Sequence, residues 1–232
     1  MSNPFKVVRD FEAALCDFTG APFAVSTTSC TMALLLAVAW HLRDDLEMLQ
    51  YGLQGGGAEW IRKSIEIPKR TYVGVPMSII HAGGRPTFRD EEWVGAYQLR
   101  PLPVWDSARW FTSQMYDMNA TGPVLQPYHG AMVCVSFHWS KTLGVQQGGA
   151  ILHDDPEADR WLRMARFDGR QEGVHPKDQK EWIIGHHAYM SPEVAAAGLV
   201  RLANLPRHNE PLPWGPGTDS EYPDLSQMPI FR

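Results

Sequence analysis

Hydrophobic positions along the chain recur at two spacings, one typical of amphipathic helices and one of buried strands. Val8, Phe11, Leu15 and Phe18 stand three or four residues apart, which places them on one face of a helix. The same pattern predicts helices over residues 7–18, 32–42, 72–81, 155–167 and 193–205, and strands over residues 21–25, 65–68, 85–89, 103–106, 132–137 and 150–153. Pro76 is expected to end or kink the third helix. Strands that alternate with helices predict a mostly parallel mixed sheet covered on both faces.

Two segments depart from this regular pattern. Residues 50–63 contain three consecutive glycines, Gly55 to Gly57, and predict a loop that lacks the Lys-Ser/Thr ending of a phosphate-binding P-loop. From Pro206 onward the chain is dense in proline and glycine. We therefore expect one domain over residues 1–205 and an extended tail over residues 206–232 that lies on a surface or stays mobile.

Length, charge and cysteine content narrow the class of protein. The 232 residues suffice for one large domain or two small ones. A net charge of −5 provides no broad basic surface, so nucleic acid is not an expected partner. The three cysteines form no CxxC pair, which favours reduced thiols. The N-terminus lacks a secretory apolar core and the longest apolar run, Met32 to Trp40, is too short to cross a bilayer, so we expect a soluble cytoplasmic protein.

Three features carry candidate chemistry. Residues 26–31, which are small and mostly hydroxylic, directly precede a predicted apolar helix. The exposed N–H groups at the start of such a helix form a natural anion site, although a simple N-cap explains the same residues. Asp106 ends a predicted strand and Lys141 closely follows another, so both are expected at the sheet edge where open α/β sheets bind ligands. Such a lysine is a candidate Schiff-base nucleophile, and such an aspartate can pair with a pyridinium nitrogen. A solvated loop lysine and a turn-capping aspartate are the simpler alternatives.

Five segments, in order along the chain, resemble one family. The strongest covers residues 134–155, CVSFHWSKTLGVQQGGAILHDD, and keeps a Ser-Phe-His-x-x-Lys-x-Leu spacing with a later Gly-Gly before a strand. The others are FEAALCDFTGAPFAVSTTSCTMALLLA, IPKRTYVGVPMSIIHAGGRPTFRD, VWDSARW and GHHAYMSPEVAAAGLVRL. In these segments the chain resembles the DegT/DnrJ/EryC1/StrS family of pyridoxal-phosphate-dependent sugar aminotransferases, in a short form that lacks the small C-terminal domain. The resemblance implies the large domain of a fold-type-I enzyme, a three-layer α/β/α sandwich.

The resemblance also implies a cofactor, pyridoxal 5'-phosphate, and roles for individual residues. Lys141 would form the internal aldimine and move the proton at the substrate carbon, while Asp106 would keep the pyridine nitrogen protonated. The other implied cofactor contacts are Ser29, Cys30 and Thr31 at the helix start and Ser136 for the phosphate, Tyr72 on the ring face, Arg109 beside the ring hydroxyl, His138 in the lysine motif, and His187 toward the neighbouring subunit's cofactor.

The chain departs from the family's pattern at several of these positions. The departures are Cys30 at a glycine, Arg109 at a glutamine or histidine, Gln147 at a glutamate, His187 at an asparagine and Tyr189 at an arginine. The leading expectation is an aminotransferase that acts on a sugar-like or nucleotide-linked carbonyl compound. Because altered groups around one carbanion redirect its reaction, a lyase, decarboxylase or dehydratase is an alternative, and a non-catalytic binding or regulatory subunit is a third.

The expected partners follow from the same resemblance. They are an amino donor, a carbonyl acceptor and a second copy of the chain in a homodimer with shared active sites, and a partner protein in place of the small domain is also considered. Residues 186–187 and 153–155 lack the spacing of a zinc site, so no metal is expected. Arg163 and Arg166 stand among acidic residues on a predicted helix and are interpreted as a solvated face.

Overall fold

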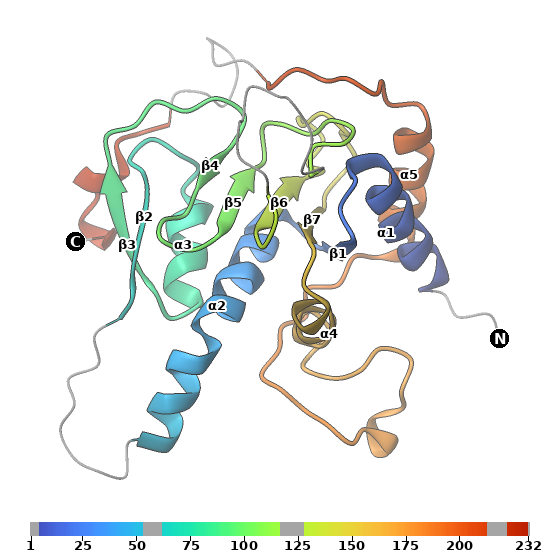
Figure 1. Cartoon of the computed structure of the whole chain (residues 1–232), viewed down its shortest axis with the longest axis horizontal. Coiled ribbons are helices and arrows are strands. Elements are labelled where there is room, and N and C mark those ends of the chain that lie inside the picture. The colour runs from blue at the N-terminus through green and yellow to red at the C-terminus, as the bar shows by residue number, and fades with distance from the viewer. Residues whose placement is uncertain (1–4, 53–61, 117–127, 213–221, 232) are drawn as a thin grey trace.

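The computed structural model describes residues 5–52, 62–116, 128–212 and 222–231, with the backbone alone for residues 44–52. Its helices are α1 (Lys6–Thr19), α2 (Cys30–Gly52), α3 (Gly74–His81), α4 (Pro156–Ala165) and α5 (Pro192–Ala203), and its strands are β1 (Phe23–Thr27), β2 (Ser64–Pro68), β3 (Arg85–Arg89), β4 (Tyr97–Gln98), β5 (Val104–Ser107), β6 (Met132–Ser136) and β7 (Gly149–His153) (Figure 1). Every helix and strand that the pattern predicts is present. Helix α2 runs about ten residues past its expected end, β4 was not expected, and the Gly55–Gly57 loop lies outside the described residues.

A five-stranded mixed sheet, in the order β1-β7-β6-β5-β4, lies at the centre of the fold. β5 and β6 pair in parallel, whereas β7 is antiparallel to both β1 and β6, and β4 is antiparallel to β5. The strands β1, β5 and β6 therefore run in one direction. The parallel pair β2-β3 continues the array through a bridge between Glu66 and Arg100, whose backbone hydrogen bonds measure 2.7 and 3.0 Å.

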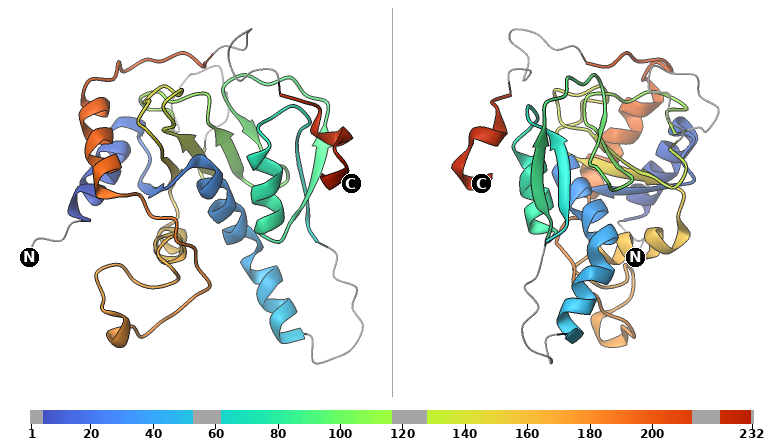
Figure 2. Two further views of the ribbon diagram at one scale, coloured as in Figure 1. Left: turned by 180° about the vertical axis from the view of Figure 1, so that it is seen from behind. Right: turned by 60° about the vertical axis from the view of Figure 1, so that its left-hand side comes forward.

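Helices cover both faces of the sheet, as the three-layer prediction requires. One apolar core joins α2, α3 and α4 to one face, through residues such as Leu36, Ile79 and Leu162. A second core joins α1 and α5 to the other face, through Phe11 and Ala195. In Figure 2, α1 and α5 lie side by side and away from α2 and α3. Within the described residues, no helix is both long enough and apolar enough to cross a membrane.

Two helix boundaries show how local sequence sets the elements. Helix α1 stops at Gly20, which adopts the left-handed conformation (φ 79°) that glycine tolerates best, and its N–H bonds to the carbonyl of Cys16. Pro76 was expected to end or kink the helix that contains it, and this prediction is wrong. The helix begins at Gly74, so Pro76 stands in the first turn, where a missing N–H breaks no helical hydrogen bond.

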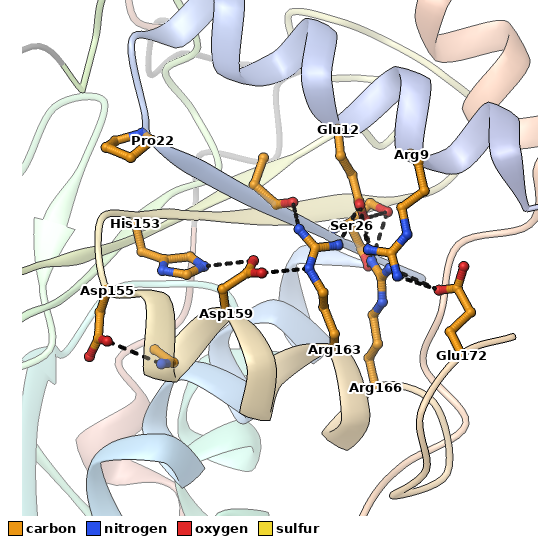
Figure 3. Close-up of polar contacts among 12 residues, drawn as sticks. Arg9, Glu12, Pro22, Ser26, His153, Asp155, Asp159, Arg163, Arg166 and Glu172 are labelled. Atoms are coloured by element: carbon orange, nitrogen blue, oxygen red, sulfur yellow. Dashed lines mark hydrogen bonds and ion pairs between the residues drawn. The ribbon is translucent and has the colours of Figure 1, made fainter. Parts of the chain in front are cut away.

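A network of buried charges joins α1 to α4 (Figure 3). Glu12 is 3% exposed and accepts hydrogen bonds from Arg163 (2.6 Å), Arg166 and the Ser26 hydroxyl (2.7 Å). Arg166 is fully buried and also donates to the Ser26 carbonyl at 2.6 Å. The interpretation of Arg163 and Arg166 as a solvated face is therefore wrong, because both side chains turn inward to the Glu12 carboxylate.

The proline- and glycine-rich C-terminal region lies against the domain in two described parts. Residues 207–212 run beside residues 109–113, where the N–H of Ser113 donates to the Arg207 carbonyl at 2.9 Å and the N–H of Leu212 to the Arg109 carbonyl at 2.7 Å. Residues 222–231 pack against the β2-β3 pair and include two short 3-10 helices, Leu225–Gln227 and Pro229–Phe231. Apart from these two short 3-10 helices, both parts are extended, and they lie on the surface of the α/β core.

Candidate active site

A cavity of about 760 Å³ opens at the carboxyl ends of β1, β5 and β6. Because these strands run in one direction, the residues that follow them meet at one edge of the sheet, where open α/β sheets bind ligands. The predicted site residues that line the cavity are Ser29, Cys30, Thr31, Tyr72, Asp106, Ser136, His138 and Lys141. The topology thus brings together residues that are more than a hundred positions apart in the sequence.

Asp106 is a buried carboxylate held by two donors. Its Oδ1 accepts a hydrogen bond from the N–H of Ala108 at 2.9 Å, and its Oδ2 accepts one from the Tyr97 hydroxyl at 2.8 Å. Burial raises the pKa of the Asp106 carboxyl, and the two donors and the charge of Lys141 oppose that rise. A desolvated carboxylate of this kind interacts more strongly with a cationic donor than it would in water.

The Tyr97 hydroxyl that holds Asp106 is itself held in place. Tyr97 is paired with Asp106 across β4 and β5, and its hydroxyl lies 2.6 Å from the Thr71 Oγ1. Burial and the neighbouring Asp106 charge raise the pKa of Tyr97 well above its usual value, so the phenol stays protonated and donates. The chain Thr71–Tyr97–Asp106 therefore fixes the orientation of the carboxylate.

Lys141 lies in the turn after β6, half-buried and in the lining of the same cavity as Asp106. Its backbone N–H donates to the His138 carbonyl at 2.8 Å, which fixes the turn. Burial raises the pKa values of Asp106 and Cys30, and the charge of Lys141 opposes both rises, so Lys141 acts electrostatically on two other residues of the cavity lining. A primary amine near a buried carboxylate in a concave site is a candidate nucleophile.

The N-terminus of α2 faces the cavity and offers it N–H groups. Ser29 Oγ caps the helix by accepting from the Met32 N–H at 3.2 Å, and Ser29 also lines the cavity, so the cap is compatible with the predicted anion site. Gly149 of β7 permits the close packing of this helix end, because a Cβ there would lie 2.5 Å from the Cys30 backbone nitrogen. Burial also raises the pKa of the Cys30 thiol, which therefore adds no negative charge to this part of the cavity.

Tyr72, Ser136 and His138 complete the part of the lining that the sequence predicts. Tyr72 is 54% exposed, and a Cβ on Gly74 would lie 2.7 Å from its ring, so glycine lets the ring lie against the start of α3. Ser136 is buried at the end of β6, and its Oγ accepts from the His138 N–H at 3.4 Å. His138 is exposed and its Nδ1 lies 2.9 Å from Ser140 Oγ.

Two predicted site residues do not line the cavity. Arg109 is buried and its guanidinium lies 3.5 Å from the Leu212 carbonyl, in the contact with residues 207–212. His187 is exposed and its Nδ1 lies 3.1 Å from Asp168 Oδ1. The proposed contact of Arg109 with the ring hydroxyl and that of His187 with a second subunit's cofactor stay predictions.

Other residues of the site were not found from the sequence. Tyr97 belongs to a two-residue strand, too short to leave a periodic signal. Tyr222, Pro223 and Met228 line the cavity but belong to the segment interpreted as a tail. The sequence signal for them was the apolar residues that follow residue 221 in a region read as an extended tail.

Comparison with known proteins agrees with this geometry. The model of the DegT/DnrJ/EryC1/StrS aminotransferase family matches residues 2–95 and 127–211, which is most of the chain. The chain belongs to this family. The matched residues include every cavity-lining residue predicted from the resemblance except Asp106, which falls between the two matched ranges.

Solved structures share the fold. The chain is 19% identical to PseC of Helicobacter pylori, an aminotransferase involved in the biosynthesis of pseudoaminic acid. The two structures match with a TM-score of 0.60 over 86% of this chain and 58% of PseC. The sugar aminotransferase CalS13 of Micromonospora echinospora is 19% identical, with a TM-score of 0.61 over 85% and 60%. AtS13 of Actinomadura melliaura is 20% identical, with a TM-score of 0.62 over 85% and 59%. The chain thus spans about three fifths of the length of these structures. A comparison with curated protein sequences found no match.

Proposed function

We propose that this chain binds pyridoxal 5'-phosphate in the cavity and transfers an amino group to a carbonyl compound that resembles a sugar. The observation that carries the proposal is the meeting of Lys141, the buried Asp106 and the α2 N-terminus in one cavity at the carboxyl ends of parallel-running strands. Membership of the aminotransferase family supports it. The sugar aminotransferases among the structural neighbours favour the substrate class.

The residues of the cavity fit this cofactor by charge and shape. The α2 N-terminus with Ser29, Thr31 and Ser136 offers N–H and hydroxyl donors to a phosphate. Tyr72 presents an exposed aromatic ring against which a pyridine ring would lie. Asp106 offers a desolvated carboxylate to a protonated ring nitrogen. The bound cofactor supplies an electron-withdrawing ring that stabilises negative charge on the substrate carbon next to nitrogen.

The chain's own residues then hold and move protons. Asp106 would keep a proton on the ring nitrogen. Hydrogen bonds from Tyr97 and from the Ala108 N–H hold its carboxylate in one orientation, so that it would stay directed at that nitrogen. Lys141 would hold the cofactor covalently through Nζ and, when released, carry a proton to or from the substrate carbon. The hydroxyls at the helix start would anchor the phosphate and so keep the reacting atoms near Lys141.

Three finer expectations belong to the same proposal. The acceptor is a sugar-like or nucleotide-linked carbonyl compound, the protein works as a homodimer, and it is cytoplasmic. His187 is exposed on the surface, which is compatible with a place at a subunit interface. Sedimentation that shows a stable monomer able to bind the cofactor would contradict the homodimer.

The test compares the wild type with Lys141→Ala, and with Lys177→Ala as a matched control on the exposed surface. After addition of pyridoxal phosphate, we expect a yellow absorbance band in the wild type and the control but none in Lys141→Ala. Borohydride reduction followed by peptide mass spectrometry should locate the label on Lys141. Equal labelling of Lys141→Ala would overturn the assignment.

The same preparation distinguishes the candidate reactions. An aminotransferase converts the bound cofactor to pyridoxamine phosphate when an amino donor such as L-glutamate or L-glutamine is added, and it needs that donor to turn over. A lyase, decarboxylase or dehydratase forms product without one. A protein that binds no cofactor would favour the binding or regulatory subunit.

A further inference from the structure

Part of the cavity wall comes from the end of the described chain. Tyr222, Pro223 and Met228 line the cavity, and they belong to residues 222–231, which we term the C-terminal segment. In Figure 1 this segment (red) runs beside β3 at the side of the molecule away from α1 and α5. The segment is far in sequence from the residues that form the sheet edge, yet it lines the same cavity.

Several contacts fix the C-terminal segment to the β2-β3 pair. Leu225 is fully buried, and its N–H donates to the Lys69 carbonyl at 2.9 Å. The Lys69 ammonium lies 3.7 Å from the carboxylate of Asp224, and the ring of Phe231 lies 5.8 Å from that of Phe88. Met228 stands between these anchors, so its position is set from both sides.

The C-terminal segment itself is internally ordered. Asp224 Oδ1 accepts from the Ser226 N–H at 3.0 Å and thereby caps the first 3-10 turn. The N–H of Met228 donates to the Leu225 carbonyl at 3.1 Å, which ties the cavity-lining methionine to the buried anchor. A substitution at Met228 that shortens its side chain therefore removes cavity contact without removing an anchor.

The charged groups of the cavity wall come from the core, which also supplies apolar side chains such as Leu34 and Val75, whereas the C-terminal segment supplies uncharged side chains alone. The core supplies the charged and hydrogen-bonding groups, among them Asp106, Lys141 and Ser136. The segment supplies a phenol ring, a proline ring and a thioether, through Tyr222, Pro223 and Met228. Surfaces of this kind bind CH-rich or aromatic faces of a ligand by burial of apolar area.

We propose that Tyr222 and Met228 are specificity-determining residues, which select substrates that carry an apolar face next to the reacting carbonyl group. This inference rests on the proposed function, because it takes the sheet-edge residues to be occupied by the cofactor. The core then holds the cofactor and the C-terminal segment contacts the substrate. Changes in the segment should alter substrate affinity and leave cofactor affinity unchanged.

Stable conjugates of the cofactor test this division without turnover. Isothermal titration of the apoprotein would compare pyridoxamine phosphate, which carries no substrate part, with N-(5'-phosphopyridoxyl)-L-phenylalanine, which carries an apolar one. We expect Met228→Ala and Tyr222→Ala to bind pyridoxamine phosphate as the wild type does, and to bind the phenylalanine conjugate about tenfold more weakly. Tyr222→Phe should retain most of the affinity, since it keeps the ring.

The control is Ile230→Ala, which shortens an exposed side chain of the same segment outside the cavity lining. It should bind both probes as the wild type does. Unchanged affinity of Met228→Ala and Tyr222→Ala for the phenylalanine conjugate would overturn the inference while the proposed function stands, and so would equal weakening for both probes. A wild type that binds neither probe would overturn the proposed function, and this inference with it.

Discussion

Two groups of buried charge differ in what surrounds them, although their burial is nearly the same. Glu12 is 3% exposed and Asp106 is 5% exposed. Glu12 is enclosed by three arginines, Arg9, Arg163 and Arg166, and by Ser26. Asp106 has two neutral donors, and the positive charge that acts on it is that of Lys141, which lines the same cavity of about 760 Å³.

We interpret this difference as one between a charge that stabilises the fold and a charge that is available to a ligand. A buried carboxylate surrounded by positively charged partners has its desolvation offset within the fold, so its loss affects stability. A buried carboxylate that borders an open cavity can still accept a hydrogen bond from a ligand. Its pKa is raised by burial, and that burial costs some stability. The two sites should therefore respond to mutation in opposite ways.

The largest effect is expected from Glu12→Ala. The substitution removes the carboxylate that lies closest to the fully buried Arg166 and leaves this arginine its longer contact with Glu172, at 3.5 Å. Breaking a buried ion pair on one side costs about 3–5 kcal/mol of unfolding free energy. Urea unfolding followed by circular dichroism would measure the loss. Asp10→Ala is the control on the same helix, because it breaks the exposed Lys6–Asp10 pair and should cost less than about 1 kcal/mol. Equal losses in the two variants would show that the network is not structural.

The second largest effect is expected from Asp106→Asn, which should lower catalytic activity and not stability. The amide keeps the shape but cannot balance a positive charge on the ring nitrogen, so turnover should drop about a hundredfold or more. Unfolding free energy should stay the same or rise, since burial disfavours the ionised carboxyl. Turnover with L-glutamate as donor and urea unfolding would be measured on one preparation. A loss of stability as large as that of Glu12→Ala would remove the distinction between the two sites.

Most of the fold, and the presence of Asp106 and Lys141 in one cavity, followed from local sequence. Amphipathic spacing located α1 and apolar runs located the strands, because burial on one face imposes a period that can be read directly. The position of Asp106 and Lys141 after strands predicted their meeting, because parallel-running strands end at one edge. Burial of Glu12 and Arg166 could not be predicted in this way, since it depends on which helices pack together and not on the spacing within either.

The rest of the site depends on pairing between distant segments. Tyr97 reaches Asp106 only because β4 folds back on β5, and two residues are too few to show a strand period. The composition of residues 206–232 predicted irregular structure, yet Leu225 and Met228 pack on the core. Frequent proline and glycine residues disfavour long helices and strands, but they do not prevent ordered contact with the core. Arg109 and His187 were placed by resemblance alone, and the structure puts both outside the cavity lining.

The smallest effect concerns a third kind of buried group, a histidine outside the cavity lining. His41 of α2 is half-buried, and among the described residues its Nε2 has no hydrogen-bond partner. Burial, and after it the charges of Arg43 and Lys63, lower the pKa of His41 from 6.5 to about 4. The imidazole is therefore neutral in the folded protein at pH values where the unfolded chain binds a proton.

This linkage has a definite sign. Between pH 6.5 and about 4 the unfolded state binds more protons at His41, so unfolding free energy falls as the pH falls through this window. Because solvent reaches part of the ring, the difference at pH 5 should be about 1 kcal/mol. The measurement is urea unfolding of the wild type and His41→Gln at pH 7.5 and pH 5, in which the wild type should lose more stability than the variant. Equal losses of stability in the two proteins would assign the acid sensitivity to other groups. A larger loss in His41→Gln would mean that His41 gains a proton on folding, so that it stabilises the fold as a charged group, as the charges around Glu12 do.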